Sequence, residues 1–230
     1  MRKQILVTIF ILLTKLSFSQ WQWAKQIGGT TATVGFAVLD ANNNIYCTGR
    51  FYAPNCYFDT DTLFANGMND IFLAKYDASG NEQWIKQIGG LNVSLFDTET
   101  PCFILIDNTN NFFYFTARFY ATVNIDSYSL TSTGGYDILV AKFDLSGNCQ
   151  WLKKIGSGSD ENGATMAFDS NGDIFCAGHL GSNGLVDTFN VTGGGFLTKF
   201  DPSGNFLWAR NEMTGGYPTS IKIVSNEILT

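Results

Sequence analysis

A 21-residue stretch occurs three times in this chain, and it limits the possible folds more than any other feature. Residues 70–90 read DIFLAKYDASGNEQWIKQIGG, residues 137–157 read DILVAKFDLSGNCQWLKKIGS, and residues 196–216 read FLTKFDPSGNFLWARNEMTGG. A shortened copy, WAKQIGG, lies at residues 23–29. Each full copy has a run rich in β-branched and aromatic residues, an Asp-x-Ser-Gly-Asn turn, and a second run that opens on tryptophan. This pattern predicts a β-hairpin.

A second repeated hairpin precedes each of these copies. Residues 36–51 contain two apolar runs joined by DANNN, and residues 103–119 and 165–180 have the same arrangement. The tryptophans at positions 23, 84, 151 and 208 follow one another at intervals of 61, 67 and 57 residues. Four short strands per interval, A to D, are typical of one blade of a β-propeller. A sandwich or barrel does not explain why a whole four-strand unit recurs.

We therefore predict an all-β chain, a β-propeller with about three complete four-stranded antiparallel blades plus an incomplete one. Residues 220–230 (SIKIVSNEILT) resemble strand A, a turn and the start of strand B. This predicts an open or truncated ring, a fragment of a longer propeller; the alternative is an arc that closes by self-association through open blade edges. The predicted organisation is a signal peptide at 1–19 and propeller repeats at 20–230, with an N-terminal strand at 21–29, blades at 35–90, 102–157 and 164–216, and the start of a fourth blade at 217–230.

The first residues have the composition of a secretory signal peptide. Arg2 and Lys3 precede a nine-residue apolar core at 5–13, and Ser-Phe-Ser at 17–19 is a small-x-small cleavage site. The core is too short for a spanning helix, which needs about 20 residues. We therefore predict an exported protein, extracellular or on the cell surface or outer envelope. The mature chain would carry 11 Lys and Arg against 20 Asp and Glu, a net charge of −9, which disfavours nucleic acid and anionic lipid as partners.

The five cysteines do not predict a disulfide framework. Cys47 and Cys176 occupy the repeat position that Phe115 holds in the middle copy, so we expect buried free thiols there. The other three cysteines lie in non-equivalent places and the total is odd, which leaves one bridge open as an alternative.

The motif resembles a known family. The residues IYCTGRF at 45–51 and NGMNDIFLAKYDASGNEQWIKQIGG at 66–90 are similar to the SBBP (β-propeller) repeat of exported bacterial proteins, and the resemblance extends over about residues 21–230. The resemblance implies a propeller at or beyond the cell surface. It implies no catalytic residue.

Successive strands of a blade run in opposite directions, so alternate connections lie on opposite faces of the propeller, and the two faces are predicted to differ. The A–B and C–D turns must lie on one face, and they are short and nearly uniform. The B–C and D–A connections must lie on the other face, and they differ strongly between copies. Binding groups tend to lie on variable loops over a rigid scaffold, so we expect any ligand on the B–C and D–A face.

Two sets of residues are candidates on that face. One equivalent position at the end of strand B holds Arg50, Arg118 and His179, which predicts part of a ring that either meets an anionic ligand or pairs with loop carboxylates. The second set is acidic and forms either a calcium site or a solvated rim, because Ca²⁺ requires six to eight convergent oxygens. Its members are Asp59, Asp61, Asp97, Glu99, Asp160 and Glu161.

Other patterns favour architecture over chemistry. The turns beginning at Asp40 and Asp169 resemble the start of an EF-hand loop, but the twelfth position is Phe51 or Leu180, so we expect hairpin turns without metal. We interpret the repeated tryptophans as wedges between blades rather than a sugar platform.

With one histidine and no nucleophile elbow, zinc helix or phosphate loop, the chain is predicted to be no enzyme and to need no cofactor. The main hypothesis is a non-catalytic module that binds or scaffolds a protein or glycan. The alternative is a remnant of a propeller enzyme, either a hydrolase or a quinoprotein-like protein.

Overall fold

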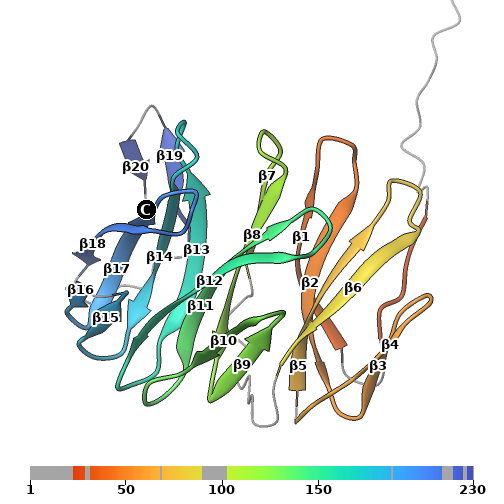
Figure 1. Ribbon diagram of the computed structural model, residues 1–230, viewed down its shortest axis with the longest axis horizontal. Coiled ribbons are helices and arrows are strands. Elements are labelled where there is room, and N and C mark those ends of the chain that lie inside the picture. The colour runs from red at the N-terminus through yellow and green to blue at the C-terminus, as the bar shows by residue number, and fades with distance from the viewer. Residues whose placement is uncertain are drawn as a thin grey trace, which may run out of the picture.

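The computed structural model describes residues 23–28, 32–67, 69–89, 103–187, 189–213, 220–224 and 227–229. These residues form antiparallel sheets, and the predicted all-β class is confirmed (Figure 1). The predicted signal peptide lies outside the described residues. The described part of the chain contains no helix long and apolar enough to cross a membrane.

Three four-strand meanders follow one another along the chain. Sheet 1 contains β1 (Ala32–Leu39), β2 (Ile45–Tyr52), β5 (Asn69–Tyr76) and β6 (Glu82–Ile88). Sheet 2 contains β7 (Phe103–Asp107), β8 (Phe112–Phe119), β11 (Asp137–Asp144) and β12 (Cys149–Ser157). Sheet 3 contains β13 (Asn162–Phe168), β14 (Ile174–Leu180), β17 (Gly194–Phe200) and β18 (Phe206–Met213). Within each sheet the strands pair in chain order, as the two predicted hairpins require.

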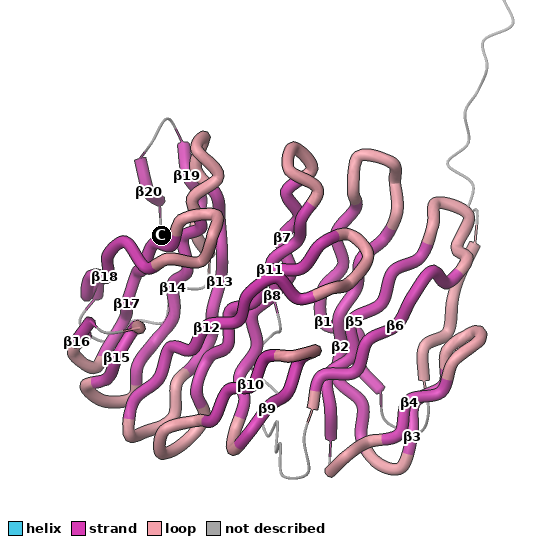
Figure 2. Tube along the Cα trace, in the orientation of Figure 1, coloured by secondary structure: helices cyan, strands magenta, loops and turns pink. Residues whose placement is uncertain are grey.

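The sheets lie side by side with the A–B and C–D turns at one end and the B–C connections at the other (Figures 1 and 2). The predicted separation into two faces is therefore present. Strand β7 contacts both β1 and β13, so the first strands of the three sheets are neighbours. A short hairpin, β19 (Lys222–Val224) and β20 (Glu227–Leu229), follows sheet 3. The described strands form an open series of sheets and do not close a ring.

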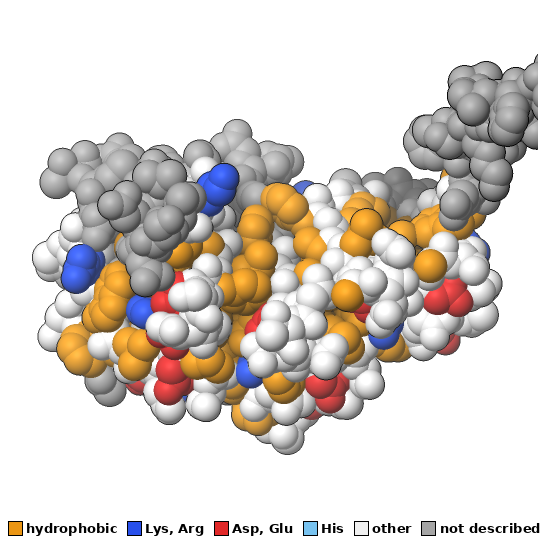
Figure 3. All heavy atoms as spheres, turned by 90° about the horizontal axis from the view of Figure 1, so that it is seen from above, with side chains coloured by type: hydrophobic (Ala, Val, Ile, Leu, Met, Phe, Trp, Pro, Cys, Tyr) orange, Lys and Arg blue, Asp and Glu red, His pale blue; other side chains and the backbone are white. Residues whose placement is uncertain are grey.

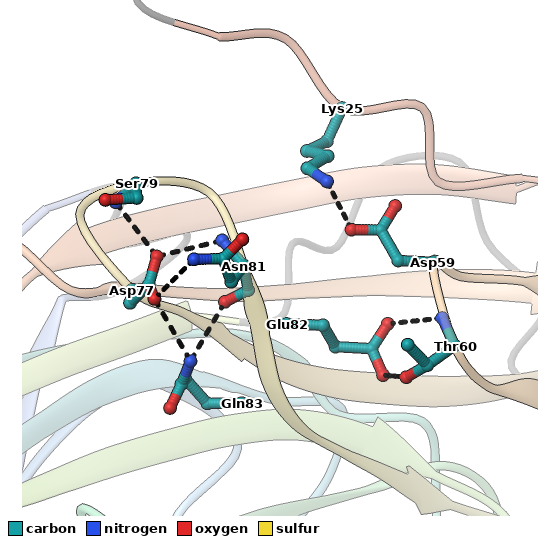
Figure 4. A network of polar contacts seen from close by, with 8 residues as sticks. All are labelled: Lys25, Asp59, Thr60, Asp77, Ser79, Asn81, Glu82 and Gln83. Carbon is teal, nitrogen blue, oxygen red and sulfur yellow. Dashed lines mark hydrogen bonds and ion pairs between the residues drawn. The ribbon is translucent and has the colours of Figure 1, made fainter.

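The repeated turns have the same internal hydrogen bonds. In the turn after β5, Asp77 Oδ1 accepts from the backbone N–H groups of Ser79 and Asn81, at 2.9 and 2.8 Å, while Gly80 has φ +82° (Figure 4). The turns that begin at Asp144 and Asp201 repeat this arrangement. The carboxylate accepts from backbone N–H groups that have no backbone acceptor in a tight turn. The glycine adopts a left-handed conformation at no steric cost.

The EF-hand-like turns are hairpin turns, as predicted. Asp40 Oδ1 accepts from the N–H groups of Asn42 and Asn44, so this carboxylate is used within its own turn. Seen from the end of the molecule that carries these turns, the exposed acids are scattered and do not form one patch (Figure 3).

Hydrophobic residues fill the spaces between neighbouring sheets. One cluster joins sheets 1 and 2 through Leu73, Phe115 and Leu139, and a second joins sheets 2 and 3 through Val140, Cys176 and Phe196. The described cysteines are all buried free thiols, which confirms the prediction for the repeat-position pair: Cys47, Cys56, Cys149 and Cys176. The fifth cysteine, Cys102, lies outside the described residues.

Each B–C connection contains a short hairpin that the sequence analysis did not predict. These hairpins are β3 (Asn55–Tyr57) with β4 (Thr62–Phe64), β9 (Thr122–Ile125) with β10 (Tyr128–Thr131), and β15 (Gly184–Val186) with β16 (Phe189–Val191). Each hairpin pairs with the end of the preceding D segment: β15 with β12, and β9 and β3 through single bridges to Gly89 and Gly28. The described part of the predicted N-terminal strand, residues 23–28, thus has one bridge and no full strand.

Tryptophans connect the sheets, as predicted. Trp84 of β6 lies on the turn of sheet 2 and donates its indole N–H to the carbonyl of Leu145 at 3.2 Å. Trp151 of β12 lies on the turn of sheet 3 and donates to the carbonyl of Pro202 at 3.3 Å. Trp23 makes the equivalent bond to the carbonyl of Ala78 at 3.1 Å. The short N-terminal copy therefore occupies the place before sheet 1 that a D strand occupies before sheets 2 and 3.

Candidate functional site

The three basic side chains chosen from the sequence occupy one equivalent position in the three sheets. Arg50 faces Ile71 across the sheet, Arg118 faces Ile138, and His179 faces Gly195. All three lie near the B–C end of the central strands. Arg118 is 9% exposed, so its guanidinium is held within the protein rather than extended into solvent.

Two tyrosines complete a cluster around Arg118. Its guanidinium carbon lies 4.6 Å from the ring centroid of Tyr136, within the range of a cation–π interaction. The ring centroid of Tyr120 lies 5.6 Å from that of Tyr136, and Tyr120 is 42% exposed. We call Arg118, Tyr120 and Tyr136 the Arg–Tyr cluster.

The sequence contained a signal for part of this cluster. Arg-Phe-Tyr occurs at residues 50–52 and again at 118–120, and the third copy reads His-Leu-Gly at 179–181. In sheet 1 the guanidinium carbon of Arg50 lies 5.2 Å from the ring centroid of Tyr52. The tripeptide thus places a tyrosine near the arginine position in both sheets. The sequence analysis considered only the charged residues and did not include these tyrosines.

The D–A connection between sheets 2 and 3 holds Tyr136 in place. The backbone N–H of Tyr136 donates to Asp160 Oδ1 at 3.0 Å, and the N–H of Glu161 donates to the Tyr136 carbonyl at 2.7 Å. Asp160 is exposed beside the Arg–Tyr cluster, as a rim acid would be. The candidate surface therefore lies at the B–C end of sheet 2 and is supported by the D–A connection that leads to sheet 3.

Glu161 is not part of a solvated rim. Its side chain is 0% exposed; Ser157 donates its backbone N–H to Glu161 Oε2 at 3.1 Å and its hydroxyl to Oε1. The sequence analysis placed Glu161 in an acidic set that forms either a calcium site or a solvated rim. Glu161 differs from a rim acid because both of its oxygens accept from Ser157 at the end of β12, which holds the side chain inside the protein.

Glu161 lies beside a second buried acid, Asp137, which is also 0% exposed. No described N–H or hydroxyl donates to Asp137 Oδ1, so an ionised Asp137 has no donor for this oxygen within the described residues. Burial, together with Asp137, raises the pKa of Glu161 to about 7, and burial raises the pKa of Asp137 although Thr133 N–H and Lys154 oppose the rise.

This pair does not have the geometry that glycoside hydrolysis needs. There, two carboxyl groups are separated by about 5–10 Å and both reach the substrate. Asp137 and Glu161 are in direct contact and closed off from solvent. Their arrangement can hold a proton and stabilise a junction.

Asp59 and Asp61 lie away from the basic positions. Hairpin β3–β4 folds back along β6, so that Thr60 contacts Glu82 and Asp59 forms an ion pair with Lys25 (Figure 4). Glu82 faces Tyr76 at the turn end of β5, whereas Arg50 faces Ile71 at the other end, about 16 Å away along the strand. The sequence analysis placed Asp59 and Asp61 on the B–C and D–A face, and the structure instead carries them toward the turn end of β6. The B–C hairpins carry their tips away from the B–C end.

The described residues contain no group of three His, Cys, Asp or Glu side chains able to hold a metal, and the calcium alternative stays a prediction. Asp97 and Glu99 lie outside the described residues, so their place relative to the site stays a prediction.

Comparison with known proteins indicates a repeat protein. The chain is 26% identical over 278 aligned residues to an uncharacterized WD repeat-containing protein of Acanthamoeba polyphaga mimivirus, covering 91% of this chain and 19% of that protein. It is 24% identical over 194 residues to the regulatory protein FlaEY of Caulobacter vibrioides, covering 80% of this chain and 19% of that protein. The chain thus spans about a fifth of the length of these relatives. No family model matches, so the SBBP resemblance stays a prediction.

Proposed function

We propose that this chain is a β-propeller module of an exported protein, and that it binds a protein or glycan through the Arg–Tyr cluster without catalysis. Support for the fold comes from three consecutive four-stranded antiparallel sheets, and from similarity to a protein named for WD repeats, whose four-stranded units form propeller blades.

The Arg–Tyr cluster is the observation that carries the binding proposal. Arginine and tyrosine are over-represented among residues that dominate binding energy. Tyr120 is exposed beside a guanidinium already oriented by Tyr136. Tyr120 and Tyr136 lie on a B–C connection, and these connections differ from sheet to sheet, whereas the other end of the sheets carries nearly identical turns.

Two substitutions test the binding proposal. The secreted chain would be screened against a glycan array and a panel of bacterial envelope proteins. We expect Tyr120→Ser to weaken any binding found by about tenfold or more, which corresponds to about 1.4 kcal/mol. Tyr57→Ser is the matched control, because Tyr57 is 53% exposed on hairpin β3–β4, away from the cluster. Binding that both substitutions weaken equally, or no binding at all, would reject the proposal.

Export is tested separately. Expression in a bacterial host with a secretion pathway should yield a mature chain that begins at Gln20. A chain that keeps residues 1–19 and stays inside the cell would contradict export without affecting the binding surface.

A further inference from the structure

The junctions between sheets contain a repeated pair of donors. Lys75 and Trp84 face each other on β5 and β6, and their Nζ and Nε1 groups both donate to the Leu145 carbonyl, each at 3.2 Å. Lys142 and Trp151 face each other on β11 and β12 and both donate to the Pro202 carbonyl, at 2.8 and 3.3 Å. One backbone carbonyl thus receives two donors from the preceding sheet.

The accepting turn needs its glycine for this contact. A Cβ atom on Gly147 would lie 3.2 Å from the indole of Trp84, and one on Gly204 would lie 2.8 Å from the indole of Trp151. Both glycines also have positive φ, at +85° and +82°. A complete junction therefore consists of a Lys–Trp pair on one sheet and an Asp-x-Ser-Gly-Asn turn on the next.

Sheet 3 carries a third Lys–Trp pair. Lys199 faces Trp208 across β17 and β18, in the same register as the two pairs before it. Among the described residues, no acceptor receives the indole N–H of Trp208. The ammonium of Lys199 binds Asp169 and Asp173 at 2.9 and 2.7 Å, which leaves one of its three N–H groups for another acceptor.

Another part of sheet 3 is already covered by the segment that follows it in the chain. Ile221, next to β19, is 9% exposed and packs with Phe175, Ala177 and Leu197 of sheet 3. Strand β19 contacts β13, much as β13 contacts β7. The first hairpin of a further unit thus lies where the preceding junctions would place it, and the described residues supply no second hairpin with its turn.

We propose that Lys199 and Trp208 form a docking site for one kind of partner, a β-hairpin that ends in an Asp-x-Ser-Gly-Asn turn. The second residue of that turn would offer its carbonyl to both donors, and its glycine would lie against the indole. This site is independent of the Arg–Tyr cluster and of whatever ligand binds there.

The test supplies such a hairpin. Residues 69–89 of this chain, which contain the turn, would be fused after Thr230 through a flexible Gly-Ser linker. We expect hydrogen exchange at the Trp208 indole N–H, assigned by its loss in Trp208→Phe, to slow at least tenfold relative to the unfused chain. The matched control is the same fusion with valine at the turn glycine, where the side chain would collide with the indole.

Three results decide the question. Slow exchange in the glycine fusion and fast exchange in the valine fusion would support the docking site. Equal exchange in the two fusions would overturn it, because a general effect of the added segment does not depend on the turn. Protection in the unfused chain that increases with protein concentration would also overturn it, since a second copy would then cover this face by another contact.

Discussion

Replacing Glu161 by glutamine should change how the stability of this protein depends on pH. Glu161 is fully buried against Asp137, and its pKa is raised from an ordinary value of 4.5 to about 7 by burial and by the neighbouring acid. The folded state therefore binds more protons than the unfolded state between these two values. By linkage, the free energy of unfolding must fall as pH rises through this interval.

The size of the effect follows from the two pKa values. A change from 4.5 to about 7 corresponds to about 3 kcal/mol, which is present in full below pH 4.5 and lost by about pH 7.5. Glutamine has no proton to lose; its oxygen can accept from the Ser157 N–H, and its NH₂ can donate to Asp137 and to the Ser157 hydroxyl, which can also accept. Glu161→Gln should therefore be similar to the natural chain near pH 4.5 and more stable above pH 7.

Urea unfolding followed by tryptophan fluorescence at intervals from pH 4.5 to 8.5 measures the difference. Asp160→Asn is the control, because it removes an adjacent but exposed acid and keeps the acceptor for the Tyr136 N–H. Parallel pH profiles for the natural chain and Glu161→Gln would refute the raised pKa of Glu161. A profile that changes equally in Asp160→Asn would assign the effect to net charge.

Three further predictions concern the junctions and the core. Gly147→Ala should lower the free energy of unfolding by about 1–3 kcal/mol because its φ is positive and an indole lies on it, whereas Gly158→Ala, where nothing lies within 4 Å, should have little effect by calorimetry. Trp84→Phe should cost about 1 kcal/mol or more in urea unfolding through the lost hydrogen bond, and Trp208→Phe clearly less. Burial raises the pKa of the described thiols, so they should react with a thiol reagent at pH 8 only as the chain unfolds: Cys47, Cys56, Cys149 and Cys176.

The repeated stretch was sufficient to predict the sheets because its strand composition, its turn residues and its tryptophan all indicate the same hairpin. The turn aspartate, the turn glycine and the following tryptophan each have a local or neighbouring role that recurs, so the unit can be recognised without knowing its partners. The equivalence of Arg50, Arg118 and His179 followed from the same register. Features that recur at a regular interval along the chain can be recognised from the sequence alone.

The hairpins in the B–C connections were not visible in this way. Their strands have three or four residues, and their sequences share little from copy to copy. Their direction depends on pairing with the end of the preceding sheet, a contact between segments about 30 residues apart in sequence. Asp59 and Asp61 were misplaced for this reason. The burial of Glu161 likewise depends on how sheets 2 and 3 pack together, and the sequence period does not predict that packing.

The candidate surface and the buried acids belong to one junction. Tyr136 is fixed by Asp160 and Glu161 through its own N–H and C=O groups, so any movement of the D–A connection would move the tyrosine on which Arg118 packs. A ligand whose binding to Tyr120 and Tyr136 depends on the position of this connection would be coupled to protonation of Glu161, and the coupling free energy would be the same in both directions. The two proposals then constrain each other: if Glu161→Gln flattens the pH profile of stability, it should also flatten the pH profile of binding at the Arg–Tyr cluster.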